Sequence, residues 1–148
     1  MPFTGSCLCG ACTYEYSGDA GPGIACHCTS CRRYTGGLAS FNLGVEAAKH
    51  KWTKKDGLAS YLDTCDKGEG PRRWFCSKCG SPLATTLEYD PKPMFLKAGA
   101  LDDLDGVMPE ISVHLFYPSA ARATAKGWDF AGQTLLKGMP GSEQVSAK

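Results

Sequence analysis

Hydrophobic and polar residues alternate in short runs along much of the chain, which is the pattern of half-buried β-strands. In residues 13–16, the two tyrosines fall on one side of such a strand and the threonine and the glutamate fall on the other. Similar runs predict strands at residues 12–17, 38–45, 58–64, 72–75, 83–89, 94–98 and 111–117. Helical turns are expected only at 46–50 and 101–104. The predicted fold class is therefore all-β, with antiparallel strands and short helical turns.

The chain length and composition favour one folded domain. Its 148 residues are close to the commonest domain size, and 43% of them are hydrophobic. We expect a single domain over residues 1–140 and a flexible C-terminal tail over 141–148. The longest apolar runs fall far short of the ~20 residues that span a membrane. No signal segment precedes the first cysteine, so we expect a cytoplasmic protein with no membrane partner.

The charge distribution argues against nucleic acid as a partner. The net charge is +1, and the 16 basic and 15 acidic residues are spread along the chain. A nucleic-acid-binding domain usually carries a basic patch or stripe, and none is present. The composition does not predict an oligomeric state.

The cysteine content changes this picture most. The chain has nine cysteines, and a reducing cytoplasm disfavours disulfides. An odd number of cysteines also cannot be used up by disulfides alone. We therefore expect most of these thiols to bind metal.

Two of the three cysteine clusters resemble each other. Cys7-Leu8-Cys9-Gly10 and Cys76-Ser77-Lys78-Cys79-Gly80 both end in glycine. A glycine there can adopt positive φ, which turns backbone N–H groups toward the sulfur atoms. Structural zinc is bound by four ligands in a tetrahedron. The sequence therefore predicts one four-thiolate site formed by Cys7, Cys9, Cys76 and Cys79, with metal binding coupled to folding.

The middle cluster supplies three ligands, Cys26, Cys28 and Cys31, and no fourth cysteine has an equally natural claim. Three protein ligands with one open position are the arrangement of catalytic zinc, which can hold a thiol as the nucleophilic thiolate. Arg32 and Arg33 follow directly. Their guanidinium groups would moderate the excess negative charge and could bind a carboxylate.

Other reactive residues have structural readings. His27 is expected to be a wall residue rather than a ligand, because the side chains of adjacent residues diverge. Cys12 is expected to be a small buried hydrophobic residue, and Cys65 a thiol in a loop. His114 is expected to pack inside the protein or to hydrogen-bond to backbone.

The cysteine motifs resemble those of the glutathione-dependent formaldehyde-activating enzyme family, which includes the centromere protein V-type domains. The matching segments are GSCLCG at 5–10, CHCTSCR at 26–32 and FCSKCGS at 75–81, with shorter matches at 96–102 and 137–140. The resemblance implies a coiled antiparallel β-fold like that of a Rab exchange-factor accessory protein. It also implies a structural zinc on the first set of four cysteines and a second zinc on Cys26, Cys28 and Cys31.

The function that the resemblance implies is the addition of glutathione to formaldehyde, formally a carbon-sulfur lyase in reverse. The leading hypothesis is thus an enzyme with two Zn²⁺ ions that presents a small thiol to an aldehyde, with Arg32, Arg33 or Lys97 binding the carboxylates of the thiol. The alternative is a non-catalytic, zinc-stabilised protein-binding module, in which Cys65 or Cys12 completes the second site. Iron in the four-thiolate site is a further possibility.

Overall fold

The structure of the protein, a computed structural model, describes residues 1–147 and divides the chain into two compact units. The first unit contains Met1–Gly21 and Leu43–Met108, and the second contains Pro22–Asn42 and the described residues from Pro109 onward. Strand β4 (Ser40–Glu46) carries the chain from the second unit into the first. The single domain over residues 1–140 stays a prediction.

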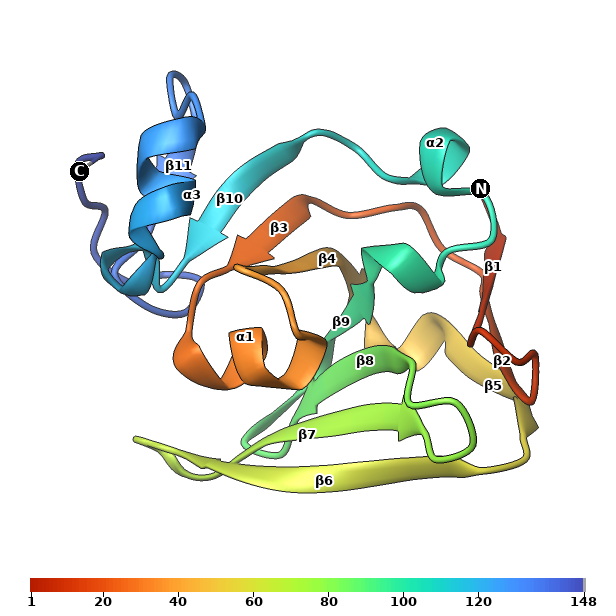
Figure 1. The fold of residues 1–148 in the computed structure, drawn as a ribbon. Coiled ribbons are helices and arrows are strands. Elements are labelled where there is room, and N and C mark those ends of the chain that lie inside the picture. The colour runs from red at the N-terminus through yellow and green to blue at the C-terminus, as the bar shows by residue number, and fades with distance from the viewer. Residues whose placement is uncertain (148) are drawn as a thin grey trace. The chain divides into compact units, whose positions relative to one another are not determined.

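The first unit is made of antiparallel β-strands joined by short turns. Strands β1, β2 and β5 form one sheet (Figure 1). Strands β6, β7, β8 and β9 pair in sequence order as a meander, and β4 pairs with the outer side of β9. The strands are β1 (Phe3–Ser6), β2 (Cys12–Tyr16), β5 (His50–Lys55), β6 (Leu58–Cys65), β7 (Gly68–Cys76), β8 (Pro82–Leu87) and β9 (Asp90–Lys97). The helical turns are η1 (Ala47–Lys49), η2 (Ala98–Ala100) and α2 (Leu104–Val107).

The alternating side chains of β2 contribute to the core of the first unit. Tyr14 and Tyr16 are buried, whereas Glu15 between them is exposed, as a half-buried strand requires. The two tyrosine rings pack into one apolar cluster with Leu43 and Leu96. This cluster supports the strands from which the cysteine-bearing turns project.

The second unit has a different strand arrangement, in the order β11-β10-β3. Strand β10 (Ile111–Leu115) pairs in parallel with both β3 (Gly23–Cys26) and β11 (Thr134–Leu135). The other elements of this unit are α1 (Thr29–Thr35), η3 (Tyr117–Ser119) and α3 (Arg122–Gly127). A separate apolar cluster contains Tyr117, Ala120, Phe130 and Leu135.

The predicted mostly-β class is confirmed, and the differences have physical reasons. The antiparallel prediction did not include the parallel pairs of the second unit, which long connections make possible. Strand β3 was not predicted because all four of its residues are buried and no alternation marks it. Helix α1 was not predicted because it begins inside a cysteine cluster and is only seven residues long. No helix of residues 1–147 is long and apolar enough to cross a membrane.

The end of the described chain folds back on β11. The N–H of Val145 donates to the carbonyl of Leu135 at 2.9 Å, and the N–H of Lys137 donates to the carbonyl of Glu143 at 2.8 Å. The mobility expected for residues 141–148 stays a prediction, and Lys148 lies outside the described residues.

A methyl group at Gly5 should destabilise the first unit. A Cβ atom there would meet the Tyr14 hydroxyl at 2.2 Å and the carbonyl oxygen of Ala100 at 2.5 Å. We expect Gly5→Ala to lower the free energy of unfolding by about 1–3 kcal/mol in a urea titration. Gly99→Ala is the matched control, because a Cβ at Gly99 meets nothing within 4 Å. Equal stability of the two variants would contradict this packing.

Candidate metal centres

The first cysteine turn connects β1 to β2. The N–H of Cys7 donates to the carbonyl of Cys12 at 2.9 Å, and the N–H of Gly10 donates to the carbonyl of Cys7 at 3.0 Å. Gly10 has φ 73°, in the left-handed region that residues with a side chain rarely adopt. The N–H of Cys12 then donates to the Cys7 sulfur at 3.2 Å. The glycine thus lets backbone donors approach a ligand sulfur, as expected from the sequence.

The second cysteine turn, between β7 and β8, is similar but one residue longer between its first cysteine and its glycine. The N–H of Cys76 donates to the carbonyl of Ser81 at 3.0 Å, and the N–H of Gly80 donates to the carbonyl of Cys76 at 2.7 Å. Gly80 has φ 77°. Each of the two turns therefore presents a pair of thiols, although the glycine N–H bonds three residues back in the first turn and four residues back in the second.

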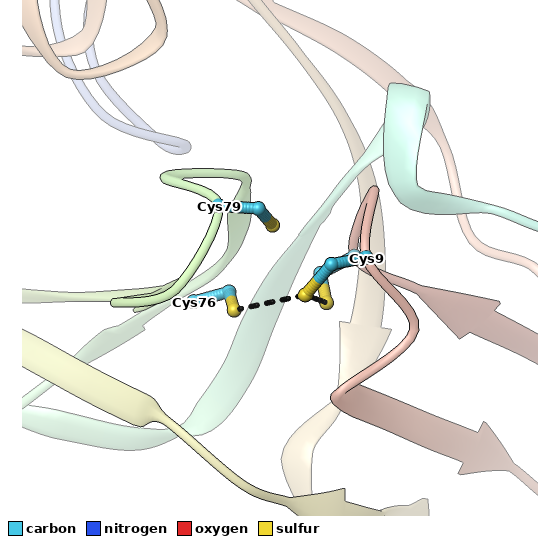
Figure 2. Close-up of side chains that lie close together, drawn as sticks. Cys9, Cys76 and Cys79 are labelled. Atoms are coloured by element: carbon cyan, nitrogen blue, oxygen red, sulfur yellow. Dashed lines mark hydrogen bonds between the residues drawn. The ribbon is translucent and has the colours of Figure 1, made fainter.

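The thiols of the two turns converge on one point. Figure 2 shows the side chains of Cys76 and Cys79 pointing toward the turn that carries Cys9. The Sγ atoms of Cys7 and Cys9 are 3.7 Å apart, and those of Cys9 and Cys76 are 3.8 Å apart. All four sulfur atoms, including that of Cys79, lie within 4.8 Å of one another.

These separations are too long for disulfides and fit a metal site. Four sulfur atoms placed ~2.3 Å from a tetrahedral zinc ion are about 3.8 Å apart, whereas disulfide sulfurs are about 2.05 Å apart. All nine cysteines are free thiols. The predicted set Cys7, Cys9, Cys76 and Cys79 is thus brought together with a spacing that fits a zinc-sized ion.

Ser81 links the two turns, and sequence reasoning missed it. Its hydroxyl accepts a hydrogen bond from the N–H of Leu8 at 3.0 Å and lies 3.2 Å from the Cys79 sulfur. The Ser81 hydroxyl and backbone N–H groups lower the pKa of Cys79 to about 5. Cys79 is therefore ready to ligate as a thiolate at neutral pH. The sequence signals for Ser81 were its place after the C-x-x-C-G turn and at the end of the matching segment at 75–81.

Cys12 lies beside this site without joining the group of four. Burial, followed by the nearby Cys76, raises the pKa of Cys12 to about 12. Its thiol donates to the carbonyl of Asp56 at 3.5 Å, and it is fully buried. This is the small buried residue that the sequence suggested. Cys65 ends β6 and belongs to neither cysteine group.

The second group is built where β3 meets α1. Cys26 ends β3, Cys28 is the residue that caps α1, and Cys31 lies in the first turn of that helix. The Cys28 sulfur accepts a hydrogen bond from the N–H of Cys31 at 3.2 Å. A thiol thus replaces the usual oxygen of a helix cap. The three sulfur atoms lie within 4.8 Å of one another.

The close packing of three thiols makes the thiolate form of the second group unfavourable without a cation. The neighbouring thiols of Cys28 and Cys31, together with burial, raise the pKa of Cys26 far above its usual range. Three adjacent thiolates repel one another unless a positive charge lies between them. Metal binding to this group would therefore release protons.

Within residues 1–147, the metal-ligand group at this place contains three residues and no fourth His, Cys, Asp or Glu. Cys26 and Cys31 are buried, whereas Cys28 is partly exposed. The donor set thus fits a metal that takes one further ligand from outside this group.

The predicted substrate residues lie in different settings. Arg32 and Arg33 follow Cys31 on α1, and the exposed Arg33 and half-buried Arg32 are its last basic residues. The Arg32 guanidinium donates to the Thr29 hydroxyl at 3.4 Å. Lys97 ends β9 in the first unit and is 4% exposed.

Sequence reasoning also missed a series of hydrogen bonds that begins at His27, next to the second group. His27, between two of the cysteines, is fully buried, and its Nε2 lies 2.8 Å from Nδ1 of His114. Nε2 of His114 in turn bonds to Oε1 of Gln133. His27 is not a member of the group of possible ligands, and its place as a wall residue stays a prediction. No sequence pattern marked Gln133.

The strands and the two cysteine groups define a class, namely a mostly-β protein with two thiolate clusters that could bind metal ions and that are compatible with zinc. Residues 2–119 match the family model described as glutathione-dependent formaldehyde-activating enzyme, and the chain belongs to this family.

A structural comparison agrees with the fold. The crystal structure of a Rhodobacter sphaeroides protein matches with a TM-score of 0.53 and 22% identity, over 73% of this chain and 96% of the other. At this identity the likeness concerns the fold alone. No curated protein matches the chain.

Loss of one ligand from the four-thiolate group should remove one metal ion and destabilise the protein. We expect Cys79→Ser to lower the metal content by one ion per chain and the unfolding temperature by about 10 °C or more. Elemental analysis and thermal unfolding would measure both. Cys65→Ser is the control, since Cys65 lies in neither group. An unchanged metal content in Cys79→Ser would contradict the assignment.

The metal affinity of the three-thiolate group should fall as the pH falls. The raised pKa of Cys26 means that its thiol is protonated at neutral pH without metal, so that binding releases protons. Each released proton makes the affinity about tenfold weaker per pH unit of acidification. Chelator competition at several pH values, with the Cys28→Ser variant reporting on the other site alone, would measure this slope. A pH-independent affinity would be the contrary result.

Proposed function

We propose that this protein is a zinc-dependent enzyme of the carbon-sulfur lyase type that joins a small thiol, glutathione, to a small aldehyde such as formaldehyde. The observation that carries the proposal is the three-cysteine group Cys26, Cys28 and Cys31, which has no fourth protein ligand among the described residues. Membership in the glutathione-dependent formaldehyde-activating enzyme family supports the choice of substrates.

Zinc is the metal that suits both groups best. Thiolate ligands favour zinc, copper(I) and iron–sulfur chemistry over magnesium or calcium. The sulfur separations of 3.7 and 3.8 Å in the four-thiolate group suit a tetrahedral zinc site. Iron in the same group would colour the protein, so that an absorption spectrum with elemental analysis separates the two metals.

We assign different roles to the two zinc ions. The four-thiolate group joins two turns that are far apart in sequence, so its zinc would stabilise the fold. The three-thiolate group would hold the zinc that takes part in the reaction. When bound there, zinc supplies a positive charge that lowers the pKa of an incoming thiol and holds it as the thiolate.

The proposed reaction balances without an oxidant or a reductant. The thiol sulfur forms a bond to the aldehyde carbon, the carbon–oxygen π bond breaks, and the proton lost by the thiol ends on the oxygen. The product is the S-hydroxymethyl thioether, and the reverse reaction releases the thiol. The chain contributes by holding the two reactants together at the partly exposed Cys28.

The cationic side chains of α1 suit a thiol that carries carboxylates. Three thiolates around a dication leave a net charge of about −1, which the adjacent Arg32 and Arg33 would offset. Arg33 is exposed and free to bind a carboxylate of glutathione from solvent. Lys97 stays the third candidate and ranks last, because its side chain is 4% exposed.

The surroundings of the reaction follow from the same chemistry. We place the protein in the cytoplasm, where reducing conditions keep nine free thiols from pairing. The alternative, a non-catalytic protein-binding module, requires a fourth protein ligand on the second metal. Neither Cys12 nor Cys65 belongs to that group, and this observation favours the enzyme.

Replacing one ligand of the open site should abolish the catalysed rate. Formaldehyde adds to thiols without help, so the assay must resolve the enzyme rate above this background, for example by NMR exchange between glutathione and its hydroxymethyl adduct. We expect Cys28→Ser to fall to the background rate, a loss of at least about 100-fold in the enzyme-dependent part.

The matched control is Cys65→Ser, which should retain the parent rate because Cys65 lies in neither metal group. Equal enzyme-dependent rates in the parent and in Cys28→Ser, with metal content measured for both, would remove the catalytic proposal.

A further inference from the structure

The three-thiolate group has a hydrogen-bonded support that begins at His27. This residue lies between the ligands Cys26 and Cys28, and its side chain is fully buried. Its backbone N–H donates to the carbonyl of Leu115 at 2.9 Å, and its Nε2 lies 2.8 Å from Nδ1 of His114. The backbone of His27 is therefore hydrogen-bonded to Leu115, and its ring to His114, both in β10.

The support continues into the C-terminal segment. Nε2 of His114 bonds to Oε1 of Gln133, whose amide nitrogen donates to the carbonyl of Asp129 at 3.5 Å. The parallel pairing of β10 with β11 sets His114 opposite Leu135, which brings Gln133 to the His114 ring. The rings of Trp128 and Phe130 lie edge-on to His114, with centroids 5.3 and 5.0 Å away.

The acceptor at the end of the chain fixes the direction of every hydrogen bond in it. The Gln133 oxygen can only accept, so Nε2 of His114 carries a proton and donates. In a neutral imidazole the other nitrogen is then an acceptor, and Nδ1 of His114 must accept from Nε2 of His27. Gln133 thereby determines the tautomer of both rings and the orientation of each.

Ring orientation at His27 controls the position of the ligands on both sides. In an extended segment, the side chains of adjacent residues point to opposite sides. Anchoring His27 on one side therefore sets the rotation of the segment that carries Cys26 and Cys28 on the other. Support of this kind behind metal ligands typically changes metal affinity by 10–100-fold.

We propose that Gln133 is a positioning residue of the three-thiolate metal site, acting through His114 and His27. Residue 133 lies beyond the family match, which ends at residue 119. The C-terminal segment thus contributes Gln133 to the support of the second metal centre. The inference rests on the proposed binding of metal by Cys26, Cys28 and Cys31.

The test measures the two metal affinities of the full chain by competition with a zinc chelator. The Cys28→Ser variant retains only the four-thiolate site and identifies its affinity. We expect Gln133→Leu to weaken the remaining, three-thiolate site by about 10–100-fold and to leave the four-thiolate site unchanged. Gln133→Glu keeps an acceptor oxygen and should stay within about 3-fold of the parent.

Two further measurements separate positioning from general stability. Gln144→Leu is the control, because it makes the same chemical change in the same segment at an exposed position. ¹⁵N NMR of the histidine rings should show His27 and His114 protonated at Nε2 in the parent, and a changed tautomer mixture in Gln133→Leu.

The outcomes are distinguishable. An unchanged second affinity in Gln133→Leu, or equal weakening of both sites, would overturn the positioning role while leaving the proposed function intact. A parent protein that binds one ion only, at the four-thiolate site, would overturn both proposals. Selective weakening that Gln133→Glu reverses would support the inference.

Discussion

Repulsion among crowded thiolates, relieved by a cation, is the interaction on which this protein depends. Two groups of cysteine sulfur atoms each lie within 4.8 Å of one another. Without a positive charge the crowded thiols of the three-cysteine group hold their protons, as the raised pKa of Cys26 indicates. With an ion bound, the same crowding becomes a set of short, strong contacts. Metal binding would therefore be coupled to the native arrangement of the cysteine turns.

The β-strands hold the cysteine-bearing segments in position, and the turns orient the sulfur atoms. The four-thiolate group lies on two turns, each of which connects two adjacent strands. Gly10 and Gly80 adopt the positive φ that these turns require. The three-thiolate group lies instead at a strand end and the start of a helix. The first arrangement offers four ligands, enough for a tetrahedral ion, whereas the second offers three.

The cysteine groups could be predicted from sequence because the spacing within each cluster is local. Cys76, Cys79 and Gly80 form a turn whose geometry is dictated within five residues, and the same is true of the turn that ends at Gly10. The alternation in β2 likewise predicted which tyrosines are buried. Strand β3 was missed because burial on both faces removes the alternating signal.

The supporting residues could not be predicted because their contacts join distant parts of the chain. The contact of Ser81 with the N–H of Leu8 depends on how two turns meet. The hydrogen bonds from His27 to His114 and from His114 to Gln133 depend on the parallel pairing of β10 with β3 and β11. No local pattern encodes such pairing, and the prediction of antiparallel strands pointed away from it.

Zinc K-edge X-ray absorption of the metal-loaded protein tests the central claim most directly, because it counts the sulfur atoms around each ion. Two ions per chain, with a sulfur shell at about 2.3 Å averaging between three and four atoms and a minor oxygen or nitrogen contribution, is the predicted result. A single ion per chain, a shell dominated by oxygen and nitrogen, or sulfur atoms paired as disulfides would contradict the account.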